Sequence, residues 1–523
     1  MTEESLESTR TSNLVEKKHH KTTPSIIYCL GLALAGIVFG FDIGSIGMIN
    51  FQTYRDQFGD ILYPSGEKRI NEVVLGLIVS GFSLGAAFGG LLLPRFADNY
   101  GKKPLILFSM FLYSLGSLTV CWAWEWWQVF LGRILNGAGV GCCGVVSVML
   151  ISELSPPDLK GPLVSSFQVF TTVGILFGAM VVYLCKNERS RWQYRISLVI
   201  QMNLAGIVAI VTAFVPESPV YLIKSRQYNK ALRSIGRING LSPTDHQVEA
   251  ELNDLRERTQ LESLNIAMSD PNSTSILKGE PRILFRTVIG TILMIFQQLT
   301  GINYFFFFGV AIFENAGVED PFLTPVILGA VNLVFSFFSL WLVSQYPRRW
   351  LLISGSLLMM ILIFMFSTCG VFFLNSSNGA VVGSIMILLT CFFIGAFACT
   401  WGPLSFVVLS ELFPLRVRSK SMSIASAMNW TTTFALSLLS PLIIRHIGFW
   451  YGYVFAACLF LSAFFVFYYI PETKYDTIEQ IDRYYESMTT FNEFSIGFPT
   501  KTFKKRNKKS STIQQPEIQL HDV

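Results

Sequence analysis

The stretch Phe296-Gln297-Gln298-Leu299-Thr300-Gly301-Ile302-Asn303 places three carboxamides inside a run that is otherwise largely apolar. A carboxamide without partners in an apolar medium costs several kcal/mol, so it faces a protein interior or a wet cavity. Each amide offers two donors and one acceptor. This chemistry suits a neutral polyol such as a sugar, and it does not suit hydride transfer, phosphoryl transfer or hydrolysis.

The composition indicates a membrane protein. Of the 523 residues, 51% are hydrophobic and 14% are charged, whereas soluble proteins average about 25% charged residues. Apolar windows of about 20 residues predict about twelve transmembrane helices. We therefore expect an all-α polytopic membrane protein embedded in a lipid bilayer.

The predicted helices divide into two groups of six around one long polar insertion. The expected divisions are a cytosolic N-terminal tail at 1–25, an N-terminal six-helix half at 26–215, a cytosolic helical loop at 216–285, a C-terminal six-helix half at 286–470 and a cytosolic C-terminal tail at 471–523. Lys and Arg gather in the segments on one side of the membrane, which the positive-inside rule assigns to the cytosol together with both termini.

Charge and cysteine usage exclude several other classes. The net charge of +5 fits membrane topology and contact with an anionic leaflet, so no nucleic acid is expected as a partner. The nine cysteines lack metal-ligand spacing, and we find no nucleophile-and-base set and no phosphate loop. We expect neither an enzyme nor a cofactor or metal. Asn375, in Asn375-Ser376-Ser377, is a candidate glycan acceptor in an external loop.

An internal repeat relates the two halves. Glu153-Leu154-Ser155-Pro156 precedes Lys160 as Glu411-Leu412-Phe413-Pro414 precedes Arg418, with a cation four residues after each Pro. Each motif follows the fourth predicted span of its half. Repeated halves are common in transporters, where the substrate site lies at their interface. Parallel repeats of six spans are the arrangement of the major facilitator fold.

Short motifs extend this pattern from about residue 26 to 480. They are Gln297-Gln298-Leu299-Thr300-Gly301-Ile302-Asn303, Pro216-Glu217-Ser218-Pro219, Trp401-Gly402-Pro403, Glu411-Leu412-Phe413-Pro414-Leu415-Arg416-Val417-Arg418, Asn429-Trp430 and Pro471-Glu472-Thr473-Lys474. In combination they resemble the sugar porter family of the major facilitator superfamily, especially its fungal hexose transporters. The resemblance implies transport of a monosaccharide, a hexose such as glucose or fructose, by alternating access.

The resemblance also implies which side chains contact the sugar. They are Gln168, Gln297, Gln298, Asn303, Asn332, Asn429 and Trp430. Phe406 stands where glucose transporters usually carry Trp, and such a change would alter the preference among hexoses. At 1.5 Å per residue, the amides lie about 10 to 17 Å inside a core about 30 Å thick, so one central cavity can hold them. The alternative for each is an amide that packs between helices.

Asp42 and Arg133 are ionisable residues inside predicted spans. Both lie roughly 10 Å below the outer boundary, and a lone charge at this depth is costly, so we expect an ion pair. In proton-coupled members of the family, the Asp at this place is the protonation site. Many facilitators keep the Asp as well, so a proton as a second partner and plain facilitated diffusion both remain open.

The resemblance further implies two gates. The cytosolic gate comprises Asp98, Lys102, Lys103, Glu153, Lys160, Arg348, Arg349, Glu411, Arg416 and Arg418, whose ion pairs hold the inner side closed in the outward-open state. The external gate contains Phe307 and Phe308, where the family carries a tyrosine pair.

Two other functions remain as alternatives. One is a non-transporting sugar sensor, against which the short segment after Pro471 argues. The other is a porter for a polyol, glycerol or inositol. We expect the protein to work as a monomer in the plasma membrane, with the vacuolar membrane as the alternative.

Overall fold

The computed structural model describes residues 23–62, 68–156, 159–268, 282–315, 320–374, 379–413, 415–474 and 478–487. The candidate glycan acceptor Asn375 lies outside these residues.

The described chain is helical apart from one short hairpin. The helices of the N-terminal half are α2 (Thr23–Ala33), α3 (Ala35–Ser45), η1 (Ile46–Asn50), α4 (Gln52–Phe58), α5 (Glu72–Leu92), η2 (Leu93–Phe96), α6 (Ala97–Tyr100), α7 (Lys102–Cys121), α8 (Trp126–Leu154), α9 (Lys160–Cys185) and α10 (Trp192–Phe214). Strands β1 (Ile61–Leu62) and β2 (Lys68–Arg69) pair antiparallel after α4.

The C-terminal half repeats this plan. Its helices are α14 (Ile283–Leu299), α15 (Ile302–Asn315), α16 (Leu323–Gln345), α17 (Arg348–Thr368), η4 (Cys369–Phe373), α18 (Gly379–Cys399), α19 (Trp401–Leu412), α20 (Leu415–Ile447), η5 (Gly448–Trp450) and α21 (Tyr451–Tyr469). Between and after the halves lie α11 (Pro219–Lys224), α12 (Tyr228–Asn239), α13 (His246–Met268) and α22 (Ile478–Ser487).

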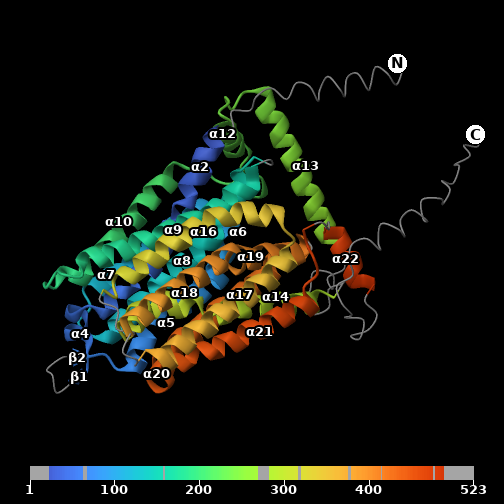
Figure 1. Cartoon of the computed structure of the whole chain (residues 1–523). Coiled ribbons are helices and arrows are strands. Elements are labelled where there is room, and N and C mark those ends of the chain that lie inside the picture. Colours follow the sequence, from blue (N-terminus) through green and yellow to red (C-terminus); the bar gives the residue numbers. More distant parts are fainter. Residues whose placement is uncertain are drawn as a thin grey trace, which may run out of the picture.

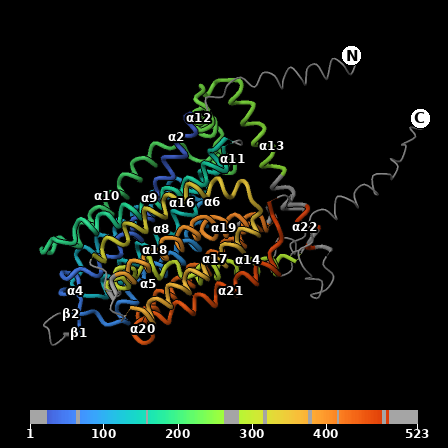
Figure 2. Tube along the Cα trace, viewed as in Figure 1, coloured from blue at the N-terminus to red at the C-terminus, as the bar shows by residue number. Residues whose placement is uncertain are grey.

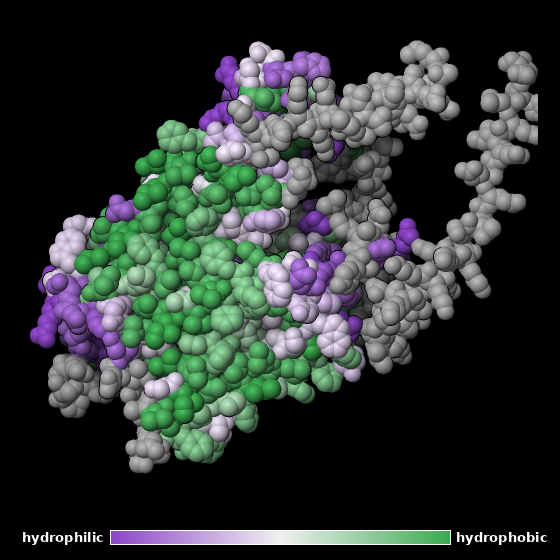
Figure 3. All heavy atoms as spheres, turned by 45° about the horizontal axis from the view of Figure 1, so that its top comes forward, coloured by the Kyte–Doolittle hydropathy of each residue, from purple (hydrophilic) through white to green (hydrophobic). Residues whose placement is uncertain are grey.

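The long helices form one elongated bundle (Figures 1 and 2). We call the end with α4, β1 and β2 the hairpin end, and the opposite end, where α12, α13 and α22 lie, the loop end. Hydrophobic residues cover the flank of the bundle and hydrophilic residues gather toward its two ends (Figure 3). Large apolar side chains such as Phe111 and Phe214 are exposed, as expected of helices that face lipid.

The described chain has 11 segments long and apolar enough to span a membrane, and the last of them, Lys420–Tyr469, includes most of α20 and all of α21. Separating these two helices gives the predicted twelve crossings, so the all-α polytopic fold is confirmed. The halves pack against each other mainly through α5 with α20 and α9 with α16.

Two predicted single spans are broken helices. The seventh span divides into α14 and α15 at Gly301, whose φ is +89°. A Cβ there would lie 2.7 Å from the Phe455 ring, so both conformation and space require glycine. The tenth span divides into α18 and α19 at Thr400, with φ −125° and ψ −86°. Breaks at membrane depth occur where backbone is buried in protein or lines a cavity.

Candidate functional site

The two helix breaks face each other through Gln297. Its Nε2 donates to the carbonyl of Trp401 at 3.2 Å and to that of Gly402 at 3.3 Å. Trp401 and Gly402 begin α19, and the Trp401 carbonyl also accepts the Ser405 hydroxyl at 2.8 Å. Gln297 is 4% exposed, and its amide therefore stabilises the α18–α19 junction from the side of α14.

A chain of amide hydrogen bonds continues from Gln297. Asn429 of α20 donates through Nδ2 to Gln297 Oε1 at 2.8 Å and to the Met294 carbonyl at 2.9 Å. Gln298 Nε2 donates to Asn429 Oδ1 at 2.9 Å. Asn303 Nδ2 in turn donates to Gln298 Oε1 at 2.6 Å. The structure thus brings four of the predicted amides together, from three helices.

The four amides differ in what they have left to offer a ligand. Gln297 and Asn429 are buried, and both of their amide groups are engaged within the protein. Gln298 and Asn303 are only half-buried. Each donates one described hydrogen bond from its NH₂ group, whereas a carboxamide can donate two. This makes Gln298 and Asn303 the candidate ligand-facing members, with Gln297 and Asn429 as their candidate support.

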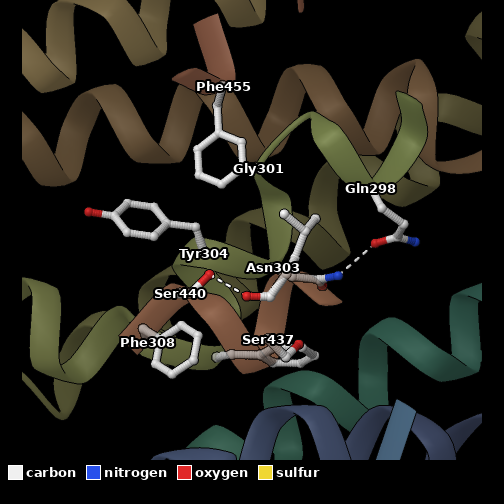
Figure 4. A pocket seen from close by; sticks show the side chains of 10 residues that line it. Gln298, Gly301, Asn303, Tyr304, Phe308, Ser437, Ser440 and Phe455 are labelled. Carbon is white, nitrogen blue, oxygen red and sulfur yellow. Dashed lines mark hydrogen bonds between the residues drawn. The ribbon is translucent and has the colours of Figure 1, made fainter. Parts of the chain in front are cut away.

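Gln298 and Asn303 line a small cavity behind the α14–α15 break (Figure 4). Its other walls are Gly301, Tyr304, Phe307, Phe308, Leu436, Ser437, Ser440 and Phe455. The cavity volume is about 10 Å³, which is about the space that one water molecule occupies. Both predicted external-gate residues, Phe307 and Phe308, are buried in its wall.

The remaining predicted contacts lie apart from this chain of amides. Asn332 is buried on α16, Gln168 is exposed on α9 and Phe406 is 45% exposed on α19. The described hydrogen bonds do not connect these three residues to the four amides. Trp430 packs across the two halves, with its ring 5.7 Å from that of Phe39 and 6.2 Å from that of Phe82.

Asp42 and Arg133 form a buried ion pair inside the N-terminal half. Arg133 Nη1 lies 3.1 and 3.0 Å from the two carboxylate oxygens, and the residues are 1% and 4% exposed. Gln201 of α10 donates through Nε2 to Asp42 Oδ1 at 3.3 Å and to Ser45 Oγ at 3.2 Å. Ser117 of α7 donates to Gln201 Oε1 at 3.2 Å.

Sequence reasoning missed Gln201 and Ser117. The available signal for Gln201 is the same as for the other amides, a carboxamide inside an apolar span. Because a buried ion pair is stable only when further hydrogen bonds satisfy its remaining polar atoms, this amide belongs to the pair.

At the loop end, two carboxylates, Glu153 and Glu217, bind groups at the start of α7. Lys102 pairs with Glu153, and Ser218 donates to the same carboxylate. Glu217 accepts the backbone N–H groups of Lys102 and Lys103 at the start of α7, both at 3.1 Å. A carboxylate at this place satisfies the first donors of the helix and complements its dipole.

The C-terminal half repeats the same arrangement. Arg348 lies 3.3 Å from Glu411, to which Thr473 donates at 2.6 Å. Glu472 accepts the backbone N–H groups of Arg348 at 3.0 Å and Arg349 at 3.2 Å, at the start of α17. Pro216-Glu217-Ser218 and Pro471-Glu472-Thr473 are therefore equivalent parts of the internal repeat.

The other predicted members of the cytosolic gate have different surroundings. Asp98 and Lys160 are exposed, Arg418 donates to the Phe413 carbonyl of its own half at 3.3 and 3.4 Å, and the side chain of Arg416 is outside the described part. The ion pairs described at the loop end are Lys102 with Glu153 in the N-terminal half, Arg348 with Glu411 in the C-terminal half, and Arg286 of the C-terminal half with Asp482 of α22.

Three described ion pairs at the hairpin end do join the two halves. They are Lys186 with Asp320, Arg55 with Glu314 at 3.6 Å and Arg445 with Glu72 at 2.5 Å. Phe51 and Phe322 stack across the same boundary, 5.4 Å between ring centroids. The structure is thus held closed at its hairpin end.

Two pseudo-symmetric six-helix halves around a polar site at broken helices define a transport protein of the major facilitator fold. The profile of the family described as "Sugar (and other) transporter" matches residues 28–485. The chain belongs to this family.

Similar proteins support this membership. The chain is 38% identical over 465 residues to the hexose transporter HXT10 of Saccharomyces cerevisiae, covering 88% of this chain and 84% of that protein. It is 37% identical to the galactose transporter of the same yeast, covering 88% and 81%. The inward-open structure of the xylose transporter XylE from E. coli superposes with a TM-score of 0.71 and 24% identity, covering 87% and 98%, which supports the fold.

Proposed function

We propose that the protein carries a neutral monosaccharide, a hexose such as glucose or fructose, across a lipid bilayer by alternating access. The observation that supports this most directly is the amide chain at two facing helix breaks, with Gln298 and Asn303 presenting their amides to a cavity. Uncharged donors and acceptors at membrane depth match sugar hydroxyls. Relatives named as hexose, glucose and galactose transporters share 36–39% of the matched residues.

The ion pairs at the two ends of the bundle indicate how the protein opens to each side of the membrane in turn. The structure corresponds to a carrier closed at the hairpin end, which we take as the extracellular side because the positive residues favour a cytosolic loop end. To admit sugar from outside, the halves must break the ion pairs of Lys186, Arg55 and Arg445. Phe307 and Phe308 must also move away from the opposite wall of the cavity. The halves then rock as units, because the loop-end pairs of each half are internal to it.

The buried Asp42–Arg133 pair favours proton symport as a second candidate. Its two charges face each other, and Gln201 donates to the carboxylate, so the pair would also serve as a structural element in a plain facilitator. The two candidates differ in whether Asp42 exchanges a proton during the cycle.

Uptake of labelled glucose, fructose, xylose and glycerol into cells without sugar carriers of their own tests these proposals. The external pH is recorded, and a protonophore is added in parallel. Equilibration that is indifferent to the protonophore identifies a facilitator. Accumulation with alkalinisation, abolished by the protonophore, identifies a proton symporter. A protein that reaches the surface and takes up no sugar contradicts the proposal and favours a sensor, and uptake of glycerol alone favours a polyol porter.

A further inference from the structure

The cavity behind the α14–α15 break has a polar wall that the amides do not account for. One face of α20 carries Asn429, Thr433, Ser437 and Ser440, at spacings of four, four and three residues, and all four are at most 4% exposed. Residues at these spacings lie on the same side of a helix. This polar face runs from the amide chain toward the hairpin end and forms part of the cavity wall at Ser437 and Ser440.

Ser437 is exceptional on this face. Thr433 donates to the Asn429 carbonyl at 3.0 Å, and Ser440 donates to the Leu436 carbonyl at 2.6 Å. The hydroxyl of Ser437 is buried and has no hydrogen-bond partner among the described residues. A buried hydroxyl without a partner costs free energy, and Ser437 is placed at a cavity where a ligand can supply the missing partner (Figure 4).

The shape of the cavity limits what that ligand group can be. Its volume of about 10 Å³ admits a single oxygen-sized group and no more. Tyr304, Phe308 and Phe455 close it with aromatic rings, which suit the C–H groups beside a hydroxyl. Gln298 and Asn303 lie in the wall as well, so a group bound there also reaches the ligand-facing amides.

We propose that Ser437 is a further sugar-binding residue, whose hydroxyl forms with Asn303 a subsite for one hydroxyl group of the transported sugar. The proposal rests on the proposed function. The subsite lies on the hairpin-end side of the amide chain and between α15 and α20. It therefore determines which ring hydroxyl must be present for a sugar to be accepted from the outside. In the closed state, a water molecule fits the same space.

The test pairs a protein variant with changes in the ligand. Monodeoxy analogues of the best-transported hexose, each lacking one hydroxyl, compete with labelled hexose for uptake. In the wild-type protein, we expect one analogue to inhibit about threefold to tenfold less well than the parent sugar, as the loss of one hydrogen bond predicts. In Ser437→Ala, the same analogue and the parent sugar should inhibit equally well, because the partner of that hydroxyl is gone.

Ser440→Ala is the matched control. Ser440 lies three residues further along the same helix and lines the same cavity, but its hydroxyl is already bonded to the Leu436 carbonyl. This variant should keep the wild-type ranking of analogues. Ser437→Cys preserves side-chain size with a weak donor and replaces Ser437→Ala if that variant does not reach the surface.

The outcomes separate the subsite from the proposed function. If every analogue keeps the same ratio to the parent sugar in wild type and Ser437→Ala, the subsite proposal is wrong and hexose transport stands. If Ser440→Ala abolishes the discrimination instead, Ser437 is also excluded. A wild-type protein that is present at the surface and takes up no hexose overturns both proposals.

Discussion

Phe82 of α5 and Trp430 of α20 meet edge to face across the two halves, with ring centroids 6.2 Å apart. The guanidinium of Arg133, which pairs with Asp42, lies 5.3 Å from the centroid of the Phe82 ring. Trp430 directly follows Asn429 of the amide chain. A continuous set of contacts therefore joins the buried ion pair of one half to the polar site of the other.

We expect Phe82→Leu to slow hexose uptake about threefold to tenfold, because the edge-to-face and cation–π contacts are each worth about 0.5–1.5 kcal/mol. Initial uptake rates, normalised to the amount of protein at the surface, measure the effect. Phe111→Leu, at a side chain of α7 that is 61% exposed, is the control. Equal rates for both variants would show that the Phe82 contact is packing without consequence for transport.

Asp42→Asn should destabilise the protein strongly. The change leaves Arg133 buried without its counter-charge, which typically costs about 3–5 kcal/mol. Thermal unfolding in detergent, followed by loss of monodisperse protein, should show a clearly lower midpoint. Glu72→Gln breaks the more exposed pair with Arg445 and should cost about 0–1 kcal/mol. A midpoint for Asp42→Asn that matches that of Glu72→Gln would mean that Arg133 finds sufficient other partners.

Substitutions of Gln297 and Gln298 should affect different properties, namely stability for Gln297 and the KM for hexose for Gln298. Gln297→Leu removes the buried amide that donates to the carbonyls of Trp401 and Gly402 and accepts from Asn429, so we expect a loss of about 1–3 kcal/mol of stability as well as of uptake. Gln298→Leu should raise the KM for hexose with a smaller change in the unfolding midpoint. The two variants carry the same substitution at adjacent positions, and each controls for the other. The reverse ranking of midpoints would contradict the division into supporting and ligand-facing amides.

Removing the hairpin-end pairs should favour the state open to the outside. Asp320→Asn, Glu314→Gln and Glu72→Gln together should remove about 1–2 kcal/mol of the free energy that favours the closed hairpin end. This corresponds to about a fivefold to thirtyfold shift in the ratio of open to closed protein. A non-transported sugar analogue that binds from outside should then bind more tightly. The matched control neutralises Asp254, which pairs with Arg258 within α13. Unchanged analogue affinity in the triple variant would show that other contacts hold this end closed.

The Lys186 pair should not act as a pH sensor. Hydrogen bonding to Asp320 raises the pKa of the Lys186 amine above its ordinary value. A group whose pKa is raised in the folded state contributes stability that is fully present below its pKa in the unfolded state. This contribution is lost only as the pH rises through its pKa in the folded state. Lys186 therefore stays charged between about pH 6 and about pH 9. Lys186→Arg should leave the pH profile of uptake unchanged in this range, and a shifted profile would contradict this assignment.

The sequence predicts the bundle well because hydropathy reports burial in lipid over whole spans. It does not reveal the breaks at Gly301 and Thr400, because both interrupt runs that remain apolar on either side. The amides of the Gln297–Asn303 stretch are visible as polar groups at depth. Which of them face a ligand depends on their partners, such as the Trp401 carbonyl, and these lie about a hundred residues away.

For a related reason, the sequence alone does not reveal the roles of Ser437 and Gln201. Serines are frequent in membrane helices and usually bond to their own backbone, as Ser440 does. Only the structure shows that the Ser437 hydroxyl lacks such a bond. Gln201 acquires its role from Asp42, which lies on a different helix and 159 positions away.

The carboxylates of Glu217 and Glu472 each accept hydrogen bonds from two main-chain N–H groups. Every residue except proline has such a group. The two positions they hold are lysines in one half and arginines in the other. These backbone contacts at the starts of α7 and α17 therefore do not depend on the side chains there, whereas Lys102 and Arg348 also pair through their side chains with Glu153 and Glu411. The geometry of the two helix starts thus rests on the backbone, and the ion pairs beside them rest on a cation at Lys102 and Arg348.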